Sequence, residues 1–368
     1  MAKNYNQLQA TLAIARGSFK AMLRNPSAVA FSFGFPLVII LVFGFISGGG
    51  PATSFALVRQ TDTANYIVRA LLKNPIVQLS IEKDTAVMRK DLEKGRIGAI
   101  VSFDSTKSPL GFSQYIVHLQ TSSAARDKYP ILKLALAQVF EKAMERNAPA
   151  AAQPLIIQEL PELSGRQYSM IDFILPGMLG FSLLGSAVFG VAFLFFSLRQ
   201  QLVLKRYYAT PISKRNILIG EGLSRVVFQL LTAVVIIGIG KFCFNFTLVH
   251  GWLTVLEMLV LSLIGLVVFM GFGFVISSIA TSESTIPPFA NLITLPQMLL
   301  GGTFFSSAAF PKWLQAIIEA LPLKQLNDAM RNVAFEGAHL TDCWKQLGIL
   351  AIWGIAIYAV AVRVFKWE

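Results

Sequence analysis

Charged residues are scarce in this sequence of 368 residues: they occupy only 14% of positions, while hydrophobic residues occupy 54%. Soluble domains carry about 25% charged residues. A chain of this length with so few charges cannot cover a water-soluble globule, so the composition excludes an ordinary soluble protein. The stretches of the chain that contain no charged residue are therefore the ones to examine as membrane-spanning segments.

Six long runs contain no Asp, Glu, Lys or Arg. They are residues 26–58, 173–198, 226–240, 258–282, 284–311 and 346–362. A helix crosses a bilayer core about 30 Å thick with about 20 mostly apolar residues. The runs therefore predict six transmembrane helices, and Phe242, Phe244 and Phe246 lengthen the third, which is short by itself.

The first run also invites an interpretation as a signal peptide. Its apolar stretch extends from Ala28 to Ile46, which is longer than the roughly 7–15 apolar residues of a signal peptide. The 25 residues before it are also too long and amphipathic for the start of such a peptide. We therefore interpret residues 26–50 as an uncleaved first transmembrane helix.

Cysteine and histidine are nearly absent. Two cysteines, Cys243 and Cys343, are too few for a disulfide framework, although a bridge between them stays open if their Cα atoms approach within about 7 Å. The histidines, His118, His250 and His339, lie far apart from one another in the sequence. The sequence predicts no catalytic residue, no metal site and no cofactor in this chain.

The basic residues are unevenly placed. If the N-terminus is cytoplasmic, the inner segments are residues 1–25, 197–225, 281–285 and 363–368. They hold 12 Lys and Arg residues against 3 acidic residues, so +9 of the net charge of +12 lies in these short segments. This is the positive-inside pattern, and it predicts a multi-pass protein of the bacterial cytoplasmic (inner) membrane with both termini cytoplasmic. Because the excess flanks spans, it favours contact with anionic lipid headgroups over nucleic acid.

Residues 1–25 are expected to form an amphipathic helix on the cytoplasmic surface. Leu8, Leu12, Ala15 and Phe19 recur at steps of three or four residues, which is the spacing of one helix face.

Residues 51–168 have the charge density of a soluble domain. The patterns over residues 54–121 and 124–147 predict the order β-α-β-α-β-β-α, with Met88 and Leu92 on one face of the second helix. We therefore expect an inserted extracytoplasmic α/β domain. It has no Cys/His cluster, nucleophile elbow or glycine-rich phosphate loop, so a spacer or docking module is preferred to an enzyme.

Residues 169–368 are expected to contain the other five transmembrane helices, with a cytoplasmic loop at residues 199–225. An unusual segment lies at residues 301–325, where Pro311 and Pro322 bracket about ten residues, too few for a helix that crosses the bilayer. Irregular backbone at membrane depth survives only when buried in protein or lining a wet cavity. The segment therefore predicts a re-entrant hairpin on the outer side.

Two segments carry a family resemblance. The first contains Leu204-Lys205-Arg206, Ala209-Thr210-Pro211-Ile212-Ser213 and Gly220. The second contains Gly301-Gly302-Thr303-Phe304-Phe305, Phe310-Pro311-Lys312-Trp313-Leu314, Leu321-Pro322-Leu323 and Asp328-Ala329-Met330-Arg331. In order and placement they resemble the cytoplasmic loop and the final outer segment of type-2 ABC transporter permeases. The layout of the whole chain resembles that family as well.

The resemblance implies a permease that dimerises and couples to two separate nucleotide-binding subunits. This chain agrees, because it has no G-x-x-x-x-G-K-[ST] sequence with which to bind ATP phosphates. It is therefore not expected to be an enzyme, and ATP and Mg²⁺ are expected in a partner chain.

Two groups of residues are candidate sites. The candidates for coupling to the ATPase are Lys205, Arg206, Thr210, Pro211 and Ile212. The alternative for this group is an ordinary basic inner loop.

The candidates for an outer gate or substrate path are Phe304, Phe305, Phe310, Trp313 and Asp172. Aromatic residues that only anchor the chain at the interface would look the same. Asp172 could be satisfied by snorkelling or by pairing with Lys312 or Arg331.

The leading functional hypothesis is the permease subunit of an ATP-driven ABC exporter that moves a lipid-like or amphipathic substrate outward. Expected partners are an ABC ATPase subunit, a second permease copy in a homodimer or related heterodimer, and membrane lipid; a periplasmic adaptor that binds residues 51–168 is also considered. The alternatives are a mechanical transducer that acts on a periplasmic partner without transport, and an ATP-independent channel or sensor. The sequence does not identify the substrate.

Overall fold

The computed structural model contains two separately packed units. One unit comprises Met1–Ser47 and Met170–Glu368, and the other comprises Gly48–Ser169. The structure describes residues 6–24, 29–45, 54–57, 78–80, 85–93, 97–107, 113–125, short stretches within 130–138, 156–163, 169–200, 212–305, 307 and 310–364.

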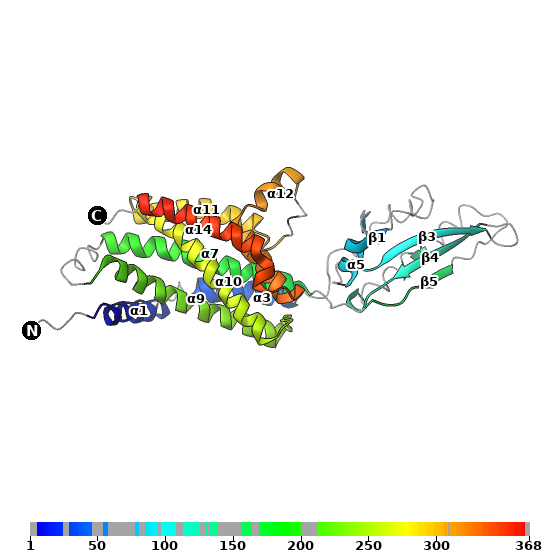
Figure 1. The fold of residues 1–368 in the computed structure, drawn as a ribbon, viewed down its shortest axis with the longest axis horizontal. Coiled ribbons are helices and arrows are strands. Elements are labelled where there is room, and N and C mark those ends of the chain that lie inside the picture. Colours follow the sequence, from blue (N-terminus) through cyan, green and yellow to red (C-terminus); the bar gives the residue numbers. More distant parts are fainter. Residues whose placement is uncertain are drawn as a thin grey trace, which may run out of the picture. The chain divides into compact units, whose positions relative to one another are not determined.

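The first unit is a helical bundle built around α7 (Met170–Gln200), as Figure 1 shows. α7 packs against α3 (Phe35–Phe45), α9 (Lys214–Phe244), α10 (Trp252–Ile279) and α11 (Ile286–Leu300). Most of the α7 side chains are buried, because neighbours cover the helix on several sides. The bundle core is a single cluster of aliphatic and aromatic side chains that spans these helices.

Four helices in the described part of the chain are long and apolar enough to cross a membrane. They are Met170–Gln200, Arg215–Phe244, Trp252–Ile279 and Leu340–Val364. The last of these ranges includes α14 (Trp344–Val364). These helices coincide with the second, third, fourth and sixth charge-free runs, so the chain is a mostly helical protein with the features of an integral membrane protein.

The first and fifth charge-free runs form shorter helices. A π-helical turn, η1 (Ala30–Gly34), leads directly into the 11-residue α3, and residues 25–28 and 46–50 on either side lie outside the described part. α11 has 15 residues and contains Pro296, which removes one helical hydrogen bond. The prediction of six crossing helices therefore goes beyond the four that length and composition support here.

The N-terminal helix α1 (Gln7–Leu23) lies along α9. It begins after Asn6, whose side chain accepts a hydrogen bond from the backbone N–H of Leu8 at 3.1 Å. Thr11 and Ala15 are buried in the contact, whereas Leu8 and Leu12 stay exposed. The exposed leucines thus leave an apolar face on α1 that this chain does not cover.

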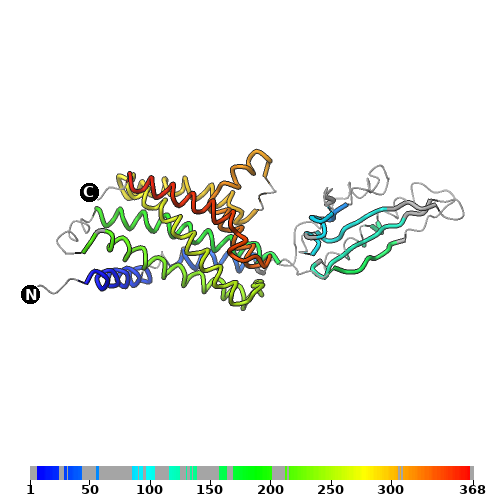
Figure 2. The backbone as a smooth tube through the Cα atoms, viewed as in Figure 1, coloured from blue at the N-terminus to red at the C-terminus, as the bar shows by residue number. Residues whose placement is uncertain are grey.

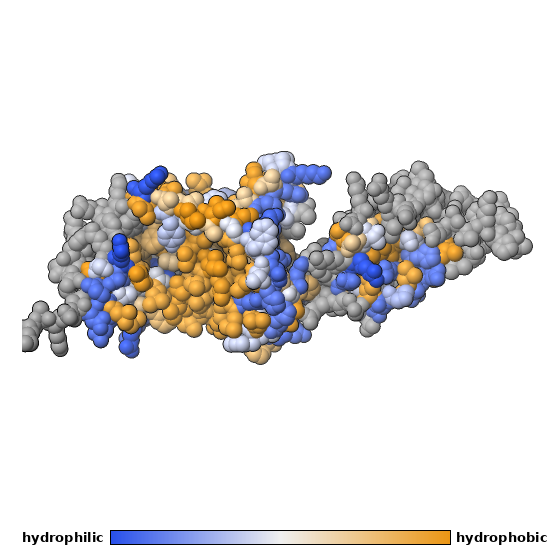
Figure 3. All heavy atoms as spheres, in the orientation of Figure 1, coloured by the Kyte–Doolittle hydropathy of each residue, from blue (hydrophilic) through white to orange (hydrophobic). Residues whose placement is uncertain are grey.

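α1 and the C-terminal end of α14 lie at the same end of the helical bundle, and α12 (Lys312–Ile318) lies at the other (Figures 1 and 2). We call these the α1 end and the α12 end. The bundle surface between them is strongly apolar in the view of Figure 3, and hydrophilic residues gather toward both ends. Ile352, Ile355 and Val362 of α14 are at least 67% exposed, as expected of side chains that face lipid.

The second unit contains a mixed five-stranded sheet of order β2-β1-β3-β4-β5. The strands are β1 (Ser54–Leu57), β2 (Gln78–Ser80), β3 (Ile100–Lys107), β4 (Ser113–Gln120) and β5 (Ile156–Glu159). β1 is parallel to β2 and to β3, β3 is antiparallel to β4, and β4 is parallel to β5.

α5 (Thr85–Glu93) packs on this sheet, and its Met88 and Leu92 are buried with Ala56 and Ile100. The first predicted helix of the domain lies outside the described residues. The long helix expected over residues 124–147 is confirmed in part: Ser123–Ala125 forms a 3-10 turn (η2) in place of its start, whereas the described residues within 130–138 are helical and Leu136 among them is buried. β5 was not predicted.

The two cysteines do not form a bridge. Both are free thiols, and Cys343 is buried while Cys243 is exposed. The Cys343 Sγ lies 3.9 Å from the carbonyl oxygen of Ala329. Cys343 therefore serves as a small core residue beneath α13 (Pro322–Arg331).

Candidate functional site

Residues 301–331 follow α11 at the α12 end, and we call them the outer segment after the orientation proposed below; residues 306, 308 and 309 lie outside the described part. The outer segment begins where α11 stops at Leu300, and Gly302 adopts a φ of +72° there, a conformation that glycine favours. Its two helices, α12 and α13, have seven and ten residues. At about 1.5 Å per residue, neither helix is long enough to cross a bilayer.

α13 is buried in the helical bundle despite its polar sequence. Leu323, Leu326, Ala329 and Met330 are all fully buried, and the helix packs against α7, α10, α11 and α14. The start of the outer segment approaches α7 closely at Gly177. A Cβ atom at that position would lie 2.8 Å from the backbone oxygen of Thr303.

Polar side chains fix the start of the outer segment. Asn327 donates from Nδ2 to the carbonyl oxygen of Gly301 at 2.8 Å, and Gln297 accepts from the backbone N–H of Leu323 at 3.3 Å. Both side chains are buried. They satisfy backbone groups that water does not reach at this depth.

Arg331 ties the end of α13 to the beginning of α7. Its Nε and Nη2 donate to the carbonyl oxygen of Phe173 at 3.2 and 3.0 Å, and Nη2 also donates to the carbonyl oxygen of Gly302. The guanidinium lies 3.9 Å from the centre of the Phe173 ring, which adds a cation–π contact. One side chain thus holds together α7, α13 and the Gly301-Gly302 turn.

Lys324 is a buried cation in the same segment. Its Nζ contacts the Asp328 carboxylate, one helical turn away, and lies 3.7 Å from Glu319 Oε1. Asp328 also faces Arg331, with Nη1 and Oδ1 3.6 Å apart. The Lys324 side chain is only 7% exposed, so the two carboxylates supply the compensation that a buried cation requires. The spacings i, i+4 and i, i+3 are the sequence signal for this cluster, which was not among the predicted site residues.

The predicted outer-gate residues occupy different environments. Phe304 packs against the bundle core, whereas Phe305 is 56% and Trp313 70% exposed; Phe310 is half-buried. Asp172 is buried, and its carboxylate accepts a hydrogen bond from the Thr247 backbone N–H at 2.9 Å. Of this set, only Phe305 and Trp313 leave large apolar surfaces exposed in the single chain.

Most of the predicted coupling residues lie outside the described part of the chain. Lys205, Arg206, Thr210 and Pro211 fall in the undescribed residues 201–211, and Ile212 is half-buried next to the start of α9. The structure therefore does not place the basic part of this loop.

Both borders of the undescribed loop are anchored to helices. On one side, Arg199 donates to the carbonyl oxygen of Ala280 at 2.9 Å, which joins the ends of α7 and α10. On the other side, Ser213 caps α9, and Gln7 of α1 accepts from the Ser213 N–H at 3.1 Å and from Asn216 Nδ2 at 2.7 Å. A displacement of the loop would thus act on α1, α7, α9 and α10.

A polar stripe at positions i, i+4 and i+8 of α9 continues into the bundle. Ser18 of α1 donates to Glu221 Oε1 at 2.7 Å, and Arg225 donates from Nη2 to the Gly190 carbonyl oxygen of α7 at 2.5 Å. Gln229 donates to Ser182 of α7 at 3.0 Å. The charge-free runs gave no indication of this stripe, although its helical spacing could have done so.

Three potential metal ligands that the sequence analysis did not group together lie close to one another at the α12 end. His250, Glu257 and His339 place one ligand atom each within 4.8 Å of one another. They come from the α9–α10 loop, the second turn of α10 and the segment before α14. Glu257 is buried and both histidines are exposed.

A family model and several known proteins that are similar to this chain are all described as transporter proteins or permeases. The sequence model of the family described as ABC-2 family transporter protein matches residues 26–363. The chain is 25% identical over 193 residues to the inner membrane transport permease YadH of Escherichia coli, which covers 52% of this chain and 73% of that protein. It is 24% identical to the probable multidrug ABC transporter permease YbhR of Escherichia coli, over 45% of each chain. It is 20% identical to the linearmycin resistance permease protein LnrN of Bacillus subtilis, over 96% of this chain and 99% of that protein.

Proposed function

Because the chain belongs to the ABC-2 family of transporter proteins, whose permeases generally work with an ABC ATPase subunit, we propose that it is the membrane subunit of an ATP-driven exporter. The ATPase is a separate chain that binds ATP and Mg²⁺. The permease works as a dimer and moves an amphipathic substrate outward through the bacterial inner membrane.

The observation that carries this proposal is the role of α7 as a continuous connecting helix. In its first turn, the carbonyl oxygen of Phe173 accepts a hydrogen bond from Arg331 of the outer segment. In its last turn, Arg199 donates a hydrogen bond to the carbonyl oxygen of Ala280 at the end of α10. The 31 residues of α7 extend over about 46 Å, more than the thickness of the hydrocarbon core. A movement at the α1 end can therefore be transmitted to the outer segment through one uninterrupted helix, in which Pro176 removes one backbone hydrogen bond near the outer segment.

In the proposed topology the α1 end faces the cytoplasm. The loop at residues 199–225, with Lys205, Arg206, Thr210, Pro211 and Ile212, docks on the ATPase. α3 and α11, together with residues next to them, complete six crossing helices, and the outer segment forms a re-entrant hairpin. Residues 1–25 lie on the cytoplasmic surface, residues 26–50 form the first span, residues 51–168 form the extracytoplasmic domain, and residues 169–368 form the remaining spans.

The substrate path is proposed along the α12 end of the dimer. Phe305 and Trp313 expose apolar surface in the single chain, and the second copy would face them. An apolar path of this kind suits drug-like or lipid-like amphiphiles. The names of two relatives, which refer to multiple drugs and to linearmycin resistance, support this class of substrate.

A mechanical transducer is the second candidate function. It is favoured by one observation, the separate packing of residues 48–169 around their own buried cluster, since such a unit can bind a periplasmic partner. In a transducer the same ATPase stroke would move this unit without any substrate flux.

One experiment tests the exporter and separates it from the transducer. The permease and its ATPase are reconstituted in vesicles, and ATP hydrolysis and efflux are measured with and without candidate amphiphiles. The exporter requires ATP-dependent flux and a substrate-stimulated ATPase. Hydrolysis that no amphiphile changes, together with no flux, would reject export in favour of the transducer.

A further inference from the structure

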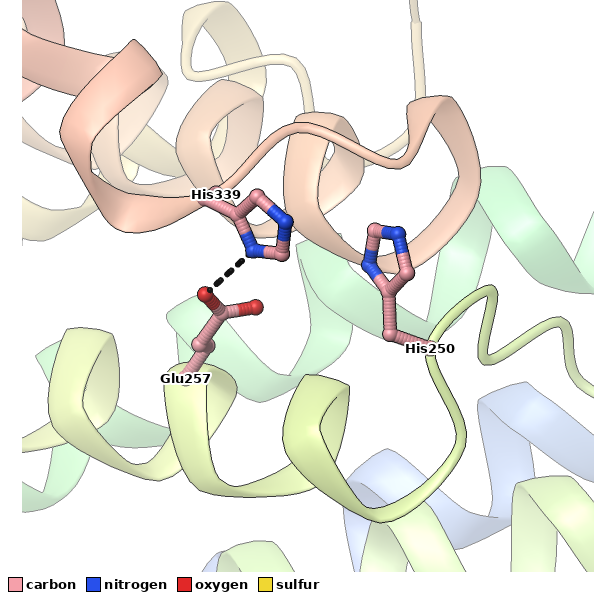
Figure 4. A group of neighbouring side chains, drawn as sticks. All are labelled: His250, Glu257 and His339. Atoms are coloured by element: carbon pink, nitrogen blue, oxygen red, sulfur yellow. Dashed lines mark hydrogen bonds and ion pairs between the residues drawn. The ribbon is translucent and has the colours of Figure 1, made fainter.

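We propose that His250, Glu257 and His339 form a binding site for a divalent transition-metal ion of the zinc class. Figure 4 shows the three side chains turned toward one another from different parts of the fold. The proposal is independent of the direction of transport and of the substrate.

The donor atoms are already close to the spacing that a metal ion imposes. Two ligands at about 2.0–2.2 Å from a tetrahedral zinc ion lie roughly 3.4 Å apart. His339 Nδ1 and Glu257 Oε1 are 3.1 Å apart, and all three ligand atoms lie within 4.8 Å of one another. His250 is exposed, so the bundle does not enclose its ring in its present orientation, and binding of the ion would draw the ring toward the other two donors.

Glu257 supplies an observation that a simple hydrogen bond leaves unexplained. Its residue is 7% exposed, and Oε1 accepts from His339 and from the Leu340 N–H at 3.4 Å. The other oxygen, Oε2, is buried and has no hydrogen-bond partner among the described residues. A buried carboxylate oxygen without a partner is costly, and a bound cation beside it would remove that cost.

The backbone positions of both histidines are fixed before any ion binds. The His250 N–H donates to Thr254 Oγ1 at 3.0 Å, and the His339 N–H donates to Asp342 Oδ2 at 2.9 Å. The two rings are stacked, with centres 4.6 Å apart and an angle of 17° between their planes. Gly337, at a φ of +71°, brings the chain before His339 against the loop of His250, because a Cβ there would lie 3.6 Å from the His250 ring. Little backbone entropy is therefore lost when the site closes on an ion.

The ligand set selects the class of metal. Two imidazoles and one carboxylate suit Zn²⁺, Co²⁺, Ni²⁺ and Cu²⁺, whereas Ca²⁺ and Mg²⁺ prefer oxygen ligands. With three protein ligands, a fourth position is left for water. An ion here would join the α9–α10 loop and α10 to the segment that begins the last span, and so hold these elements together at the α12 end.

Zinc binding by the purified full chain tests the proposal. The chain carries a tag without histidine, is stripped with a chelator, and is titrated with Zn²⁺ against a chromophoric chelator. We expect one Zn²⁺ per chain, with affinity reduced at least about tenfold in His250→Ala and in Glu257→Gln. His250→Ala is the decisive variant because it keeps the Glu257–His339 hydrogen bond. His118→Ala, in the second unit, is the matched control and should bind as the wild type does.

Co²⁺ provides a second readout, because its absorption reports a tetrahedral nitrogen and oxygen environment in the wild type that His250→Ala should lose. Excess Mg²⁺ or Ca²⁺ should not displace the ion. Equal Zn²⁺ affinity in wild type and His250→Ala, or no binding by the wild type at about 100 μM free Zn²⁺, would overturn the proposal.

Discussion

Arg331 reaches back 158 residues to Phe173, donates two hydrogen bonds to its carbonyl oxygen and lies 3.9 Å from the centre of its ring. The carbonyl belongs to the first turn of α7, and the arginine ends α13. The outer segment and the connecting helix are therefore joined by one guanidinium, which is planar and binds several acceptors at once.

Arg331→Lys should weaken this junction, because an ammonium group cannot reproduce the forked contact with Phe173 and Gly302. Hydrogen bonds to charged groups contribute about 1.5–3 kcal/mol each, so we expect a lower melting temperature and a loss of coupled ATPase activity. Thermal unfolding in detergent and ATPase assays of the complex measure the two effects. Lys312→Met, at an exposed cation of the same segment, is the control and should change neither.

Gly177→Ala should displace the Gly301–Thr303 turn from α7. The added methyl would lie 2.8 Å from a backbone oxygen, and overpacking of this kind costs about 1–3 kcal/mol, more than the roughly 1 kcal/mol that alanine adds to helix propensity. Gly185→Ala in the same helix has no atom within 4 Å of the new Cβ and should be neutral or stabilising. Equal unfolding temperatures for the two variants would contradict the close approach.

Reversing the charges of Lys205 and Arg206 together, or replacing Pro211 by Gly, should uncouple the ATPase without preventing membrane insertion. Single exposed ion pairs contribute only about 0–1 kcal/mol, so the double reversal is the informative variant. Co-purification of the ATPase and its stimulation by the permease are the measurements. Reversal of Arg363 and Lys366, which the topology also places in the cytoplasm, serves as the control, and wild-type coupling in the loop variants would remove these residues from the interface.

Cysteine labelling tests the proposed orientation. In a background with Cys243→Ser, Trp313→Cys should react with an impermeant maleimide from outside the cell, because Trp313 is 70% exposed at the α12 end. Arg215→Cys, exposed at the α1 end, should react only after permeabilisation. The opposite pattern would invert the topology and with it the assignment of the coupling loop.

The sequence predicts the membrane-spanning parts well, because long runs without charge have a direct physical meaning in a bilayer. The second, third, fourth and sixth runs form long apolar helices. The first and fifth form shorter ones in the described part of the chain. α3 is followed by residues 46–50, which lie outside that part, and α11 ends at the Gly301-Gly302 turn, where Gly302 has a positive φ. Glycine barely changes the hydropathy of the run, so hydropathy alone could not reveal this end.

The candidate sites are predicted less completely. Lys324, Asp328 and Arg331 lie at helical spacings, and their cluster could have been found from the sequence once α13 was recognised as a helix. His339 and Glu257 are separated by 82 residues, and their approach depends on how α14 returns to α10. Asp172 illustrates a third case. Its carboxylate accepts a hydrogen bond from the backbone N–H of Thr247, just after α9, so an ionisable residue near the membrane interface can have a structural partner in place of a substrate.

The stretch from Glu319 to Arg331 contains two cations, Lys324 and Arg331, and two anions, Glu319 and Asp328, so its formal charge is zero. A charge that crosses the full membrane potential exchanges about 2.3 kcal/mol of electrical work per 100 mV. A neutral stretch exchanges none to first order, whichever way it moves. This stretch, which includes α13, can therefore shift during a transport cycle without working against the voltage across the membrane, and the energy needed to move it is the same in energised and in depolarised cells.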